Sequence, residues 1–310
     1  MKPLDLRVDL GRGLILKNPV MGASGTYGYG VEYEDLVDLS AMGALVLKGL
    51  SPLPRRGNKP PRLVETAAGL LNSIGLENIG VVAFMAEKYP RLAELGVTLV
   101  ANVYGETEDD YLRVIERLSQ PDAEFVRGLE LNVSCPNVKA GGVTFGAYPE
   151  ILGRLVERVR AATSKHVMVK LTPNVTDIVA LAKVAATAGA DSLSAINTLL
   201  GIAVDLKTRR PKLGNITGGL SGPAIKPVAL RMAWQVARAV NVPVVGIGGI
   251  LTGEDALEFL CVGCRAVQTG TVNFIDPRAP LRVAGEIEVW LEREGLTSPA
   301  QIVGTFADRR

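Results

Sequence analysis

The chain has 310 residues, of which 47% are hydrophobic and only 5% aromatic, and its formal net charge at pH 7 is +2. A chain of this length forms two average domains or one α/β barrel, with a core of Val, Leu, Ile and Ala. The balanced charge argues against nucleic acid or an anionic membrane as a partner. The charged opening "MKPLDLRVDL" is not typical of a secretory signal, and no run approaches the ~18 uncharged apolar residues of a membrane span.

The first predicted element is a β-hairpin in "LRVDLGRGLILKN", residues 6–18, which we expect to close the bottom of the fold. After it, short β-rich runs alternate with longer amphipathic segments. Strands are predicted at residues 19–24, 44–49, 97–103, 129–134, 167–172, 192–197, 242–249 and 266–271. The clearest helices are predicted at residues 110–119, 151–162, 177–190, 228–240, 254–260 and 282–295. Several of these helices run into glycine, a common helix stop.

Apolar strands that alternate with helices indicate a parallel sheet covered by helices on its outer side. Eight such units favour a closed (β/α)8 TIM barrel, formed by residues 1–310 as a single domain with long βα loops over the active site. An open doubly wound sheet is the alternative, because "GIGGILTG" at residues 246–253 resembles a dinucleotide-binding fingerprint. That segment lacks the G-x-G-x-x-G spacing and comes late in the chain.

The three cysteines limit the redox and metal chemistry of the chain. Cys261 and Cys264 form a lone "CVGC" with metal-ligand spacing, but there is no second pair and no histidine nearby. Half a zinc site does not bind zinc, so we interpret these residues as structural thiols and predict no metal. Since three cysteines cannot all pair, a reducing cytoplasm is the simplest setting.

Polar side chains gather near the carboxyl ends of six different predicted strands. They are Ser24, Lys48, Asn102, Asn132, Lys170 and Asn197. One polar residue at a strand end is commonplace and usually bonds a loop. In a barrel, however, these ends converge on the face that carries the active site, so six of them together predict a site.

Glycine-rich segments follow the last two predicted strands, at Gly248, Gly249, Gly270 and Thr271. Loops at these places commonly bind phosphate through backbone N–H groups, although such glycines are equally common in tight turns. Together with the polar strand ends, they favour a cofactor that carries phosphate.

The two strand-end lysines are compatible with two chemistries. Lys170 could form a Schiff base, as in barrel aldolases, or Lys170 and Lys48 could stabilise anions. Three asparagines favour the second reading, because amides offer both donors and acceptors to a flat heterocycle with NH and C=O groups.

Cys135 begins the loop "CPNVKAGGVTFGAYPE", residues 135–150, which we expect to close over the site as a lid. The only histidine, His166, starts a different strand at the far end of the barrel. Proton removal therefore falls to Cys, Lys or a carboxylate, and we place Cys135 in the pocket as a candidate base. The alternative is that Cys135 has no catalytic role and is a small buried hydrophobic residue.

The whole chain resembles the class 1 dihydroorotate dehydrogenases through motifs that occur in order and with compatible spacing. They are "LLNSIGLEN", "LELNVSCPN", "KLTPN", "SAINTL", "GGLSGPAIKP", "GIGGI" and "QTGT". "GGLSGPAIKPVALRM" and "INTLLGIAVD" are similar to the 1B subclass, its FMN-bearing catalytic subunit. The resemblance implies an FMN barrel that oxidises dihydroorotate to orotate in pyrimidine biosynthesis. It also implies a homodimer joined, as a heterotetramer, to a subunit with FAD and a [2Fe–2S] cluster that reduces NAD⁺.

The resemblance also implies roles for individual residues. Cys135 would take the C5 proton, and Lys48 would contact both ligands as the second catalytic residue. Substrate contacts are implied for Lys48, Asn72, Ser73, Ile74, Gly75, Leu76, Asn132, Asn197 and Thr198. FMN contacts are implied for Ser24, Lys48, Gly49, Asn102, Asn132, Lys170, Ile196, Gly222, Gly248, Gly249, Gly270 and Thr271.

Four alternatives remain. A 1A-type enzyme would pass electrons to fumarate without a partner, and a Schiff-base aldolase would use Lys170 without a flavin. A dihydropyrimidine dehydrogenase module would need cluster-binding extensions, for which the chain has no cysteines. A flavin-storage or scaffold protein would be indifferent to Cys135→Ser.

Overall fold

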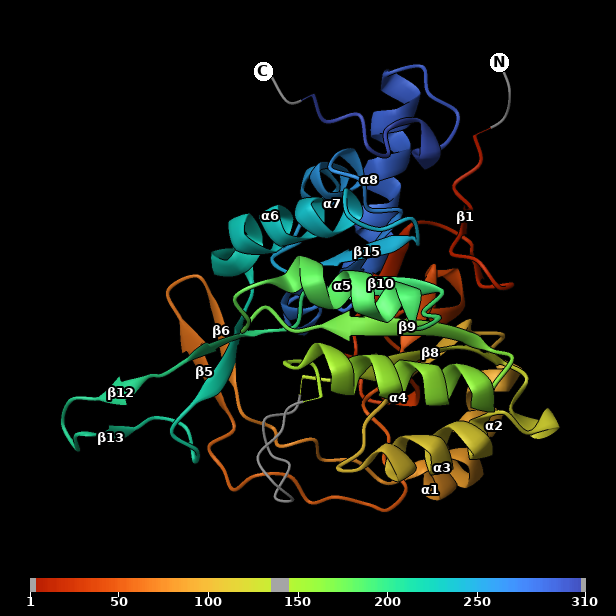
Figure 1. The fold of residues 1–310 in the computed structure, drawn as a ribbon. Coiled ribbons are helices and arrows are strands. Elements are labelled where there is room, and N and C mark those ends of the chain that lie inside the picture. The colour runs from red at the N-terminus through yellow and green to blue at the C-terminus, as the bar shows by residue number, and fades with distance from the viewer. Residues whose placement is uncertain (1–3, 135–144, 308–310) are drawn as a thin grey trace.

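The computed structural model describes residues 4–134 and 145–307, and its centre is a closed barrel of eight parallel strands (Figure 1). In chain order the strands are β3 (Val20–Gly22), β4 (Ala44–Val46), β7 (Leu99–Val103), β8 (Val126–Asn132), β9 (His166–Leu171), β10 (Ser192–Ala195), β15 (Val244–Ile247) and β16 (Ala266–Thr269). Each neighbours the next around the ring, and β16 closes it against β3. The eight predicted strands and the TIM-barrel fold are therefore confirmed.

Helices cover the outside of the barrel (Figure 1). They are α1 (Val81–Glu87), α2 (Tyr89–Glu94), α3 (Glu108–Leu118), α4 (Pro149–Ala162), α5 (Ile178–Thr187), α6 (Lys226–Ala237), α7 (Gly253–Cys261) and α8 (Ala279–Arg293). Local chemistry explains where several begin. Thr107 and Thr252 each form a capping box with the Asp three residues on, and the Asp177 carboxylate accepts from the first N–H groups of α5. Among the described residues, no helix is long and apolar enough to cross a bilayer.

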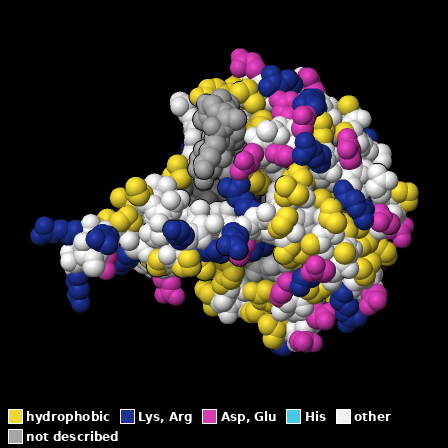
Figure 2. Space-filling model, turned by 90° about the horizontal axis from the view of Figure 1, so that it is seen from below, with side chains coloured by type: hydrophobic (Ala, Val, Ile, Leu, Met, Phe, Trp, Pro, Cys, Tyr) yellow, Lys and Arg dark blue, Asp and Glu magenta, His cyan; other side chains and the backbone are white. Residues whose placement is uncertain are grey.

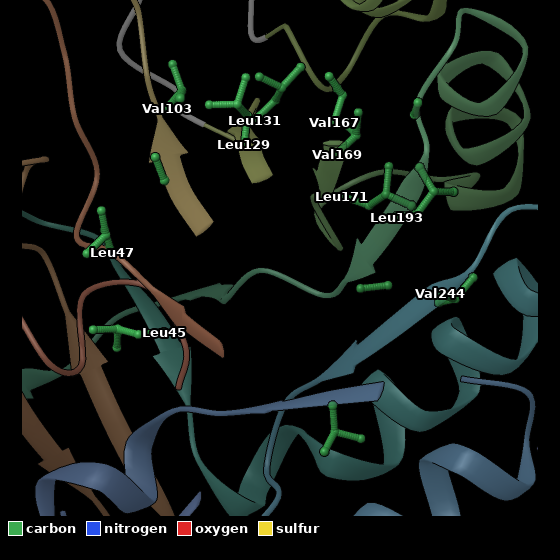
Figure 3. Packing of buried hydrophobic residues seen from close by; sticks show 14 of the residues in the cluster. Leu45, Leu47, Val103, Leu129, Leu131, Val167, Val169, Leu171, Leu193 and Val244 are labelled. Atoms are coloured by element: carbon green, nitrogen blue, oxygen red, sulfur yellow. The ribbon is translucent and has the colours of Figure 1, made fainter. Parts of the chain in front are cut away.

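The main hydrophobic core is the ring between the strands and these helices. Side chains such as Leu45, Val103 and Val169 point away from the centre of the barrel (Figure 3) and are fully buried. Because successive strand residues alternate sides, the residues between them face the barrel interior. The outward side chains of the strands are apolar and form the core. The inward positions near the carboxyl ends of the strands are therefore free to carry polar, functional side chains.

The N-terminal hairpin closes the bottom of the barrel, as predicted. Strand β1 (Val8–Asp9) pairs antiparallel with β2 (Ile15–Leu16), and between them Leu10 and Leu14 are fully buried. They join a separate apolar cluster with inward side chains of the barrel strands, including Met21 and Met168. The floor of the barrel is therefore packed mainly with apolar side chains.

The structure adds a second sheet that sequence analysis treated as loops. Strands β5 (Leu63–Thr66) and β6 (Gly69–Asn72) follow β4, and β11 (Leu199–Gly201) and β14 (Gly218–Ser221) follow β10. They pair antiparallel in the order β11-β14-β6-β5. This pairing joins segments far apart in sequence, so local patterns do not reveal it. Because both insertions leave the carboxyl ends of barrel strands, the sheet lies on the active-site side.

An extended arm, residues 202–216, projects beyond this second sheet. It contains the two-stranded pairing of β12 (Val204–Asp205) with β13 (Arg210–Pro211). Lys and Arg side chains gather toward its end (Figure 2), and Leu206 near the tip is 86% exposed.

Candidate active site

The structure brings the six predicted strand-end residues to one rim of the barrel. Asn102, Asn132 and Lys170 lie at or near the ends of β7, β8 and β9. Ser24, Lys48 and Asn197 follow β3, β4 and β10 by two residues. Contacts link neighbours along this rim. Ser24 Oγ donates to the Leu47 carbonyl at 2.8 Å, and the Leu50 N–H donates to the Asn102 carbonyl at 2.8 Å.

A buried polar cluster lies directly beneath this rim. Lys170 is 7% exposed and Asn102 is 1% exposed, and both contact the carboxylate of Glu130. Asn102 Nδ2 donates to Glu130 Oε2 at 2.7 Å, and Lys170 Nζ lies 3.5 Å from the same oxygen. The amide oxygen of Asn102 is buried and has no partner among the described residues. It lies beside Gly49, where a Cβ would come within 3.2 Å of it.

Lys48 lies more openly, with its side chain 26% exposed. Its ammonium is 3.7 Å from Glu77 Oε2, and Arg62 donates to that same oxygen at 2.7 Å. Two cations therefore share one carboxylate at the mouth of the site. An anionic ligand that approaches Lys48 meets positive charge already gathered there.

Asn132 and Asn197 form a second pair on the rim. Asn197 Nδ2 donates to Asn132 Oδ1 at 3.4 Å, and Asn197 Oδ1 accepts from the Thr198 N–H at 2.8 Å. The Tyr111 hydroxyl of α3 holds the backbone of Asn132 by donating to its carbonyl at 2.8 Å. The two amides are thus oriented toward each other with donors and acceptors left for a ligand.

The segment Asn72–Leu76, implied to bind substrate, is part of the second sheet and the turn after it. Asn72 ends β6, and its side-chain amide donates to the Gly219 carbonyl at 3.2 Å. Asn58 holds the turn through both the carbonyl and the hydroxyl of Ser73. Gly75 has φ +74°, and a Cβ there would collide with Asn58, so this turn requires glycine.

Glycines line the opposite arc of the rim, at the ends of β15 and β16. Gly248 and Gly249 have positive φ and pack closely against the start of α6, where a Cβ would clash. Thr271, after Gly270, donates to Ser221 Oγ at 2.8 Å. Gly222 lies beside Thr271, and its φ is +94°. Ile196 is buried, and its N–H donates to the Ile247 carbonyl. The arc offers close backbone approach and a hydroxyl, which suit a phosphate.

Cys135 lies outside the described residues. The residues that flank segment 135–144 are described: the Gly146 N–H donates to the Val133 carbonyl at 2.9 Å, and the Ser134 N–H donates to Asn132 Oδ1 at 3.3 Å. The described residues on either side of that segment therefore both lie at the carboxyl end of β8, next to Asn132.

The other two cysteines are far from this rim, at the end of α7. Both are free thiols; Cys264 is buried and Cys261 is partly buried, as predicted for structural residues. Burial raises the pKa of the Cys264 thiol, so it stays protonated. Among the described residues, no group of His, Cys, Asp and Glu could hold a metal ion.

Sequence reasoning missed three polar residues inside the barrel: Glu130, Ser194 and Gln268. Each is fully buried, and the Ser194 hydroxyl and the Gln268 amide both donate to Glu130 Oε1 at 2.8 Å. A signal was present, because in "LELN" Glu130 precedes Asn132 by two residues and so points to the same side of β8.

Comparison with known proteins agrees with this architecture. A family model described as dihydroorotate dehydrogenase matches residues 9–291. The chain is 55% identical over 306 residues to the dihydroorotate dehydrogenase B (NAD(+)) catalytic subunit of Pelobacter propionicus, covering 99% of both chains. It is 53% identical over 307 residues to the protein of that name from Geobacter metallireducens, again covering 99% of both. The Geotalea daltonii protein is 52% identical over 303 residues, with 97% of this chain and 98% of the relative covered.

Proposed function

The chain belongs to the dihydroorotate dehydrogenase family, and from this we propose that it oxidises (S)-dihydroorotate to orotate in pyrimidine biosynthesis. The observation that carries the proposal is the convergence of Lys48, Lys170 and the amides of Asn102, Asn132 and Asn197 on one rim. This donor set suits two flat heterocycles with NH and C=O groups, one of which bears a carboxylate.

FMN is the cofactor that these residues fit. We expect one FMN per chain, and we treat residues 1–310 as a single domain. The buried side-chain oxygen of Asn102 has no hydrogen-bond donor among the described residues, and the N–H of a flavin ring would supply one. Gly49, which has no side chain, leaves room beside this oxygen. Gly222, Gly248, Gly249, Gly270 and Thr271 would hold the phosphate end, with Ser24 and Ile196 along the ring. When bound, FMN would supply the acceptor for the hydride that leaves C6 of the substrate.

The chain's own residues bind and orient the substrate. Lys48 would bind the substrate as well as the flavin, with Asn132, Asn197 and Thr198 reading the ring and carboxylate. The segment Asn72–Leu76 would cover the substrate, since its turn is rigid and is held by Asn58. Together these contacts would exclude water from the reacting carbon.

Cys135 is the proposed base that removes the C5 proton. No histidine lies at the rim, because His166 is at the floor of the barrel, where its ring nitrogens contact Gly11 and Ser192. Ser134, the residue before Cys135, donates its N–H to Asn132 Oδ1, and this supports the proposed role. As a thiolate it would accept the proton directly from carbon.

The name "catalytic subunit" of the relatives supports an electron-transfer partner for this chain too, and "NAD(+)" favours that acceptor over fumarate. We assign FAD and the [2Fe–2S] cluster to the partner subunit, in a heterotetramer built on a homodimer. Exposed Ile202, Val204 and Leu206 on the arm support a protein contact there. Free Cys261 and Cys264 fit a reducing cytoplasm. The comparisons lend no support to a Schiff-base aldolase, and Lys170 already faces a carboxylate.

An anaerobic visible spectrum before and after addition of L-dihydroorotate tests the proposal. A yellow protein whose flavin band bleaches on addition would establish cofactor, substrate and reaction together. A yellow protein that keeps its colour would contradict the substrate. A colourless protein that fails to take up added FMN would contradict the cofactor.

A further inference from the structure

The middle of the barrel contains a fully buried carboxylate, Glu130, surrounded by four polar groups from other strands. Oε1 accepts from Ser194 Oγ and Gln268 Nε2, both at 2.8 Å. Oε2 accepts from Asn102 Nδ2 at 2.7 Å and lies 3.5 Å from Lys170 Nζ. The carboxylate is therefore saturated with donors and faces one cation.

Filling the interior of a barrel with this polar cluster costs free energy of folding. TIM-barrel interiors are normally packed with branched apolar side chains. A buried ion pair is often no more stable than apolar residues of the same volume, because desolvation offsets the attraction. Stability alone therefore does not account for Glu130.

Glu130 lies between the floor of the barrel and the ligand rim. On β8 it precedes Asn132 by two residues, and it pairs in register with Asn102 on one side and Met168 on the other. Met168 belongs to the apolar floor cluster. Through Oε2, Glu130 contacts Asn102, whose free oxygen is assigned above to the flavin ring, and Lys170, for which the family resemblance implies an FMN contact.

We propose that Glu130 is a positioning residue which fixes the Asn102 amide and the Lys170 ammonium from below and sets the reduction potential of the bound flavin. The inference rests on the proposed function. Because Nδ2 of Asn102 is committed to Glu130, its Oδ1 is the atom presented toward Gly49 and the rim. The negative charge of Glu130 also offsets the positive charge of Lys170 beside the ring.

This partial cancellation of the Lys170 charge by Glu130 changes the affinity of the site for the two redox forms of FMN. An uncompensated ammonium beside the ring favours the anionic, reduced form of FMN over the oxidised form. The negative charge of Glu130 makes this preference for reduced FMN smaller. Binding of FMN and reduction of FMN form a closed thermodynamic cycle. A change in the ratio of the dissociation constants of oxidised and reduced FMN therefore corresponds to a change in the reduction potential of the bound flavin.

The test compares Glu130→Gln with the parent protein at the same pH. The amide keeps the shape of the side chain. Gln268 Oε1, which has no partner among the described residues, can accept from the new amide after rotation. We measure the dissociation constants of oxidised and reduced FMN by titration of the apoprotein, and the midpoint potential of the bound flavin.

We expect the ratio of oxidised to reduced dissociation constants to rise about tenfold or more, which is about 30 mV for a two-electron couple. Ser194→Ala is the matched control. It removes one neutral donor to the same carboxylate, and its hydroxyl bonds Glu130 rather than Asn102 or Lys170, so it should lower the melting temperature and leave the ratio unchanged. Glu130→Met, which fills a similar volume without a polar atom, repeats the test if the first variant does not fold.

The outcomes are distinguishable. A parent protein that binds no FMN overturns the proposed function, and the inference with it. A parent that binds FMN, with a Glu130 variant that weakens both redox forms equally, keeps the function and overturns the inference, because a purely structural role predicts that result.

Discussion

Cys135 and Asn132 show how much of the proposed chemistry depends on single side chains. Asn132, three residues before Cys135, is held by Tyr111 through its backbone and by Asn197 through its amide. Catalytic groups gain most from such fixed placement, because a base is effective only within hydrogen-bond reach of its proton. In the proposed mechanism the rest of the rim positions the ligands, and Cys135 alone accepts the proton.

A thiol base predicts a distinct pH profile. The reference pKa of cysteine is about 8.5, and only the thiolate accepts a proton, so flavin reduction should speed up as pH rises from about 6 to 9. Cys135→Ser should slow reduction near neutral pH by roughly 10²–10⁴-fold. Stopped-flow absorbance of the flavin measures both, with Cys261→Ser as a control thiol far from the rim. A flat profile in which reduction limits turnover would exclude Cys135 as the base.

The N-terminal hairpin is an element with a structural rather than a catalytic task. Its buried Leu10 and Leu14 cover the apolar floor. Its turn is tied to the barrel by an ion pair between Arg12 and Asp191 at 2.7 Å and by a hydrogen bond to His166. In that bond His166 Nδ1 donates to the Gly11 carbonyl at 2.9 Å, so Nε2 of the neutral ring accepts from Ser192 Oγ at 2.7 Å. The only histidine of the chain therefore holds the floor in place.

His166 makes the stability of the fold sensitive to mild acid. Burial is the main cause that lowers the pKa of His166 below its ordinary value. The unfolded chain then binds this proton at a higher pH than the folded chain does. The free energy of unfolding should fall as pH drops from about 7 to 5.

Urea unfolding at several pH values measures this effect. In His166→Gln, which cannot titrate there, the loss of unfolding free energy between the two pH values should be smaller than in the parent. An equal loss in both proteins would show that other groups cause it.

At the scale of the whole molecule, the barrel supplies one face on which inserted segments assemble a site. The second sheet joins the insertions after β4 and β10, and it brings Asn72 next to Gly219. The arm extends from the same sheet and exposes apolar side chains (Figure 2). The proposed substrate cover and the proposed subunit contact thus belong to one structural unit.

The partner-subunit proposal predicts that the chain alone reduces NAD⁺ poorly. After dihydroorotate has bleached the flavin under anaerobic conditions, addition of NAD⁺ should produce little NADH absorbance, whereas an artificial dye should restore the flavin band. Addition of the FAD and iron–sulfur subunit should then raise NADH formation by orders of magnitude. Rapid NADH formation by the single purified chain would contradict the need for a partner.

The sequence by itself determined the barrel and most of the rim, because strand and helix periods are local and parallel strands bring their carboxyl ends together. Lys48, Asn102, Asn132 and Lys170 could therefore be found by position alone. Only the tertiary structure decided the rest. The sheet that joins β6 to β14 pairs Asn72 with Gly219, and the Glu130 cluster collects side chains from β7, β8, β9, β10 and β16. Such contacts depend on register and on which side chains face inward around a closed ring, and no single stretch of sequence encodes that.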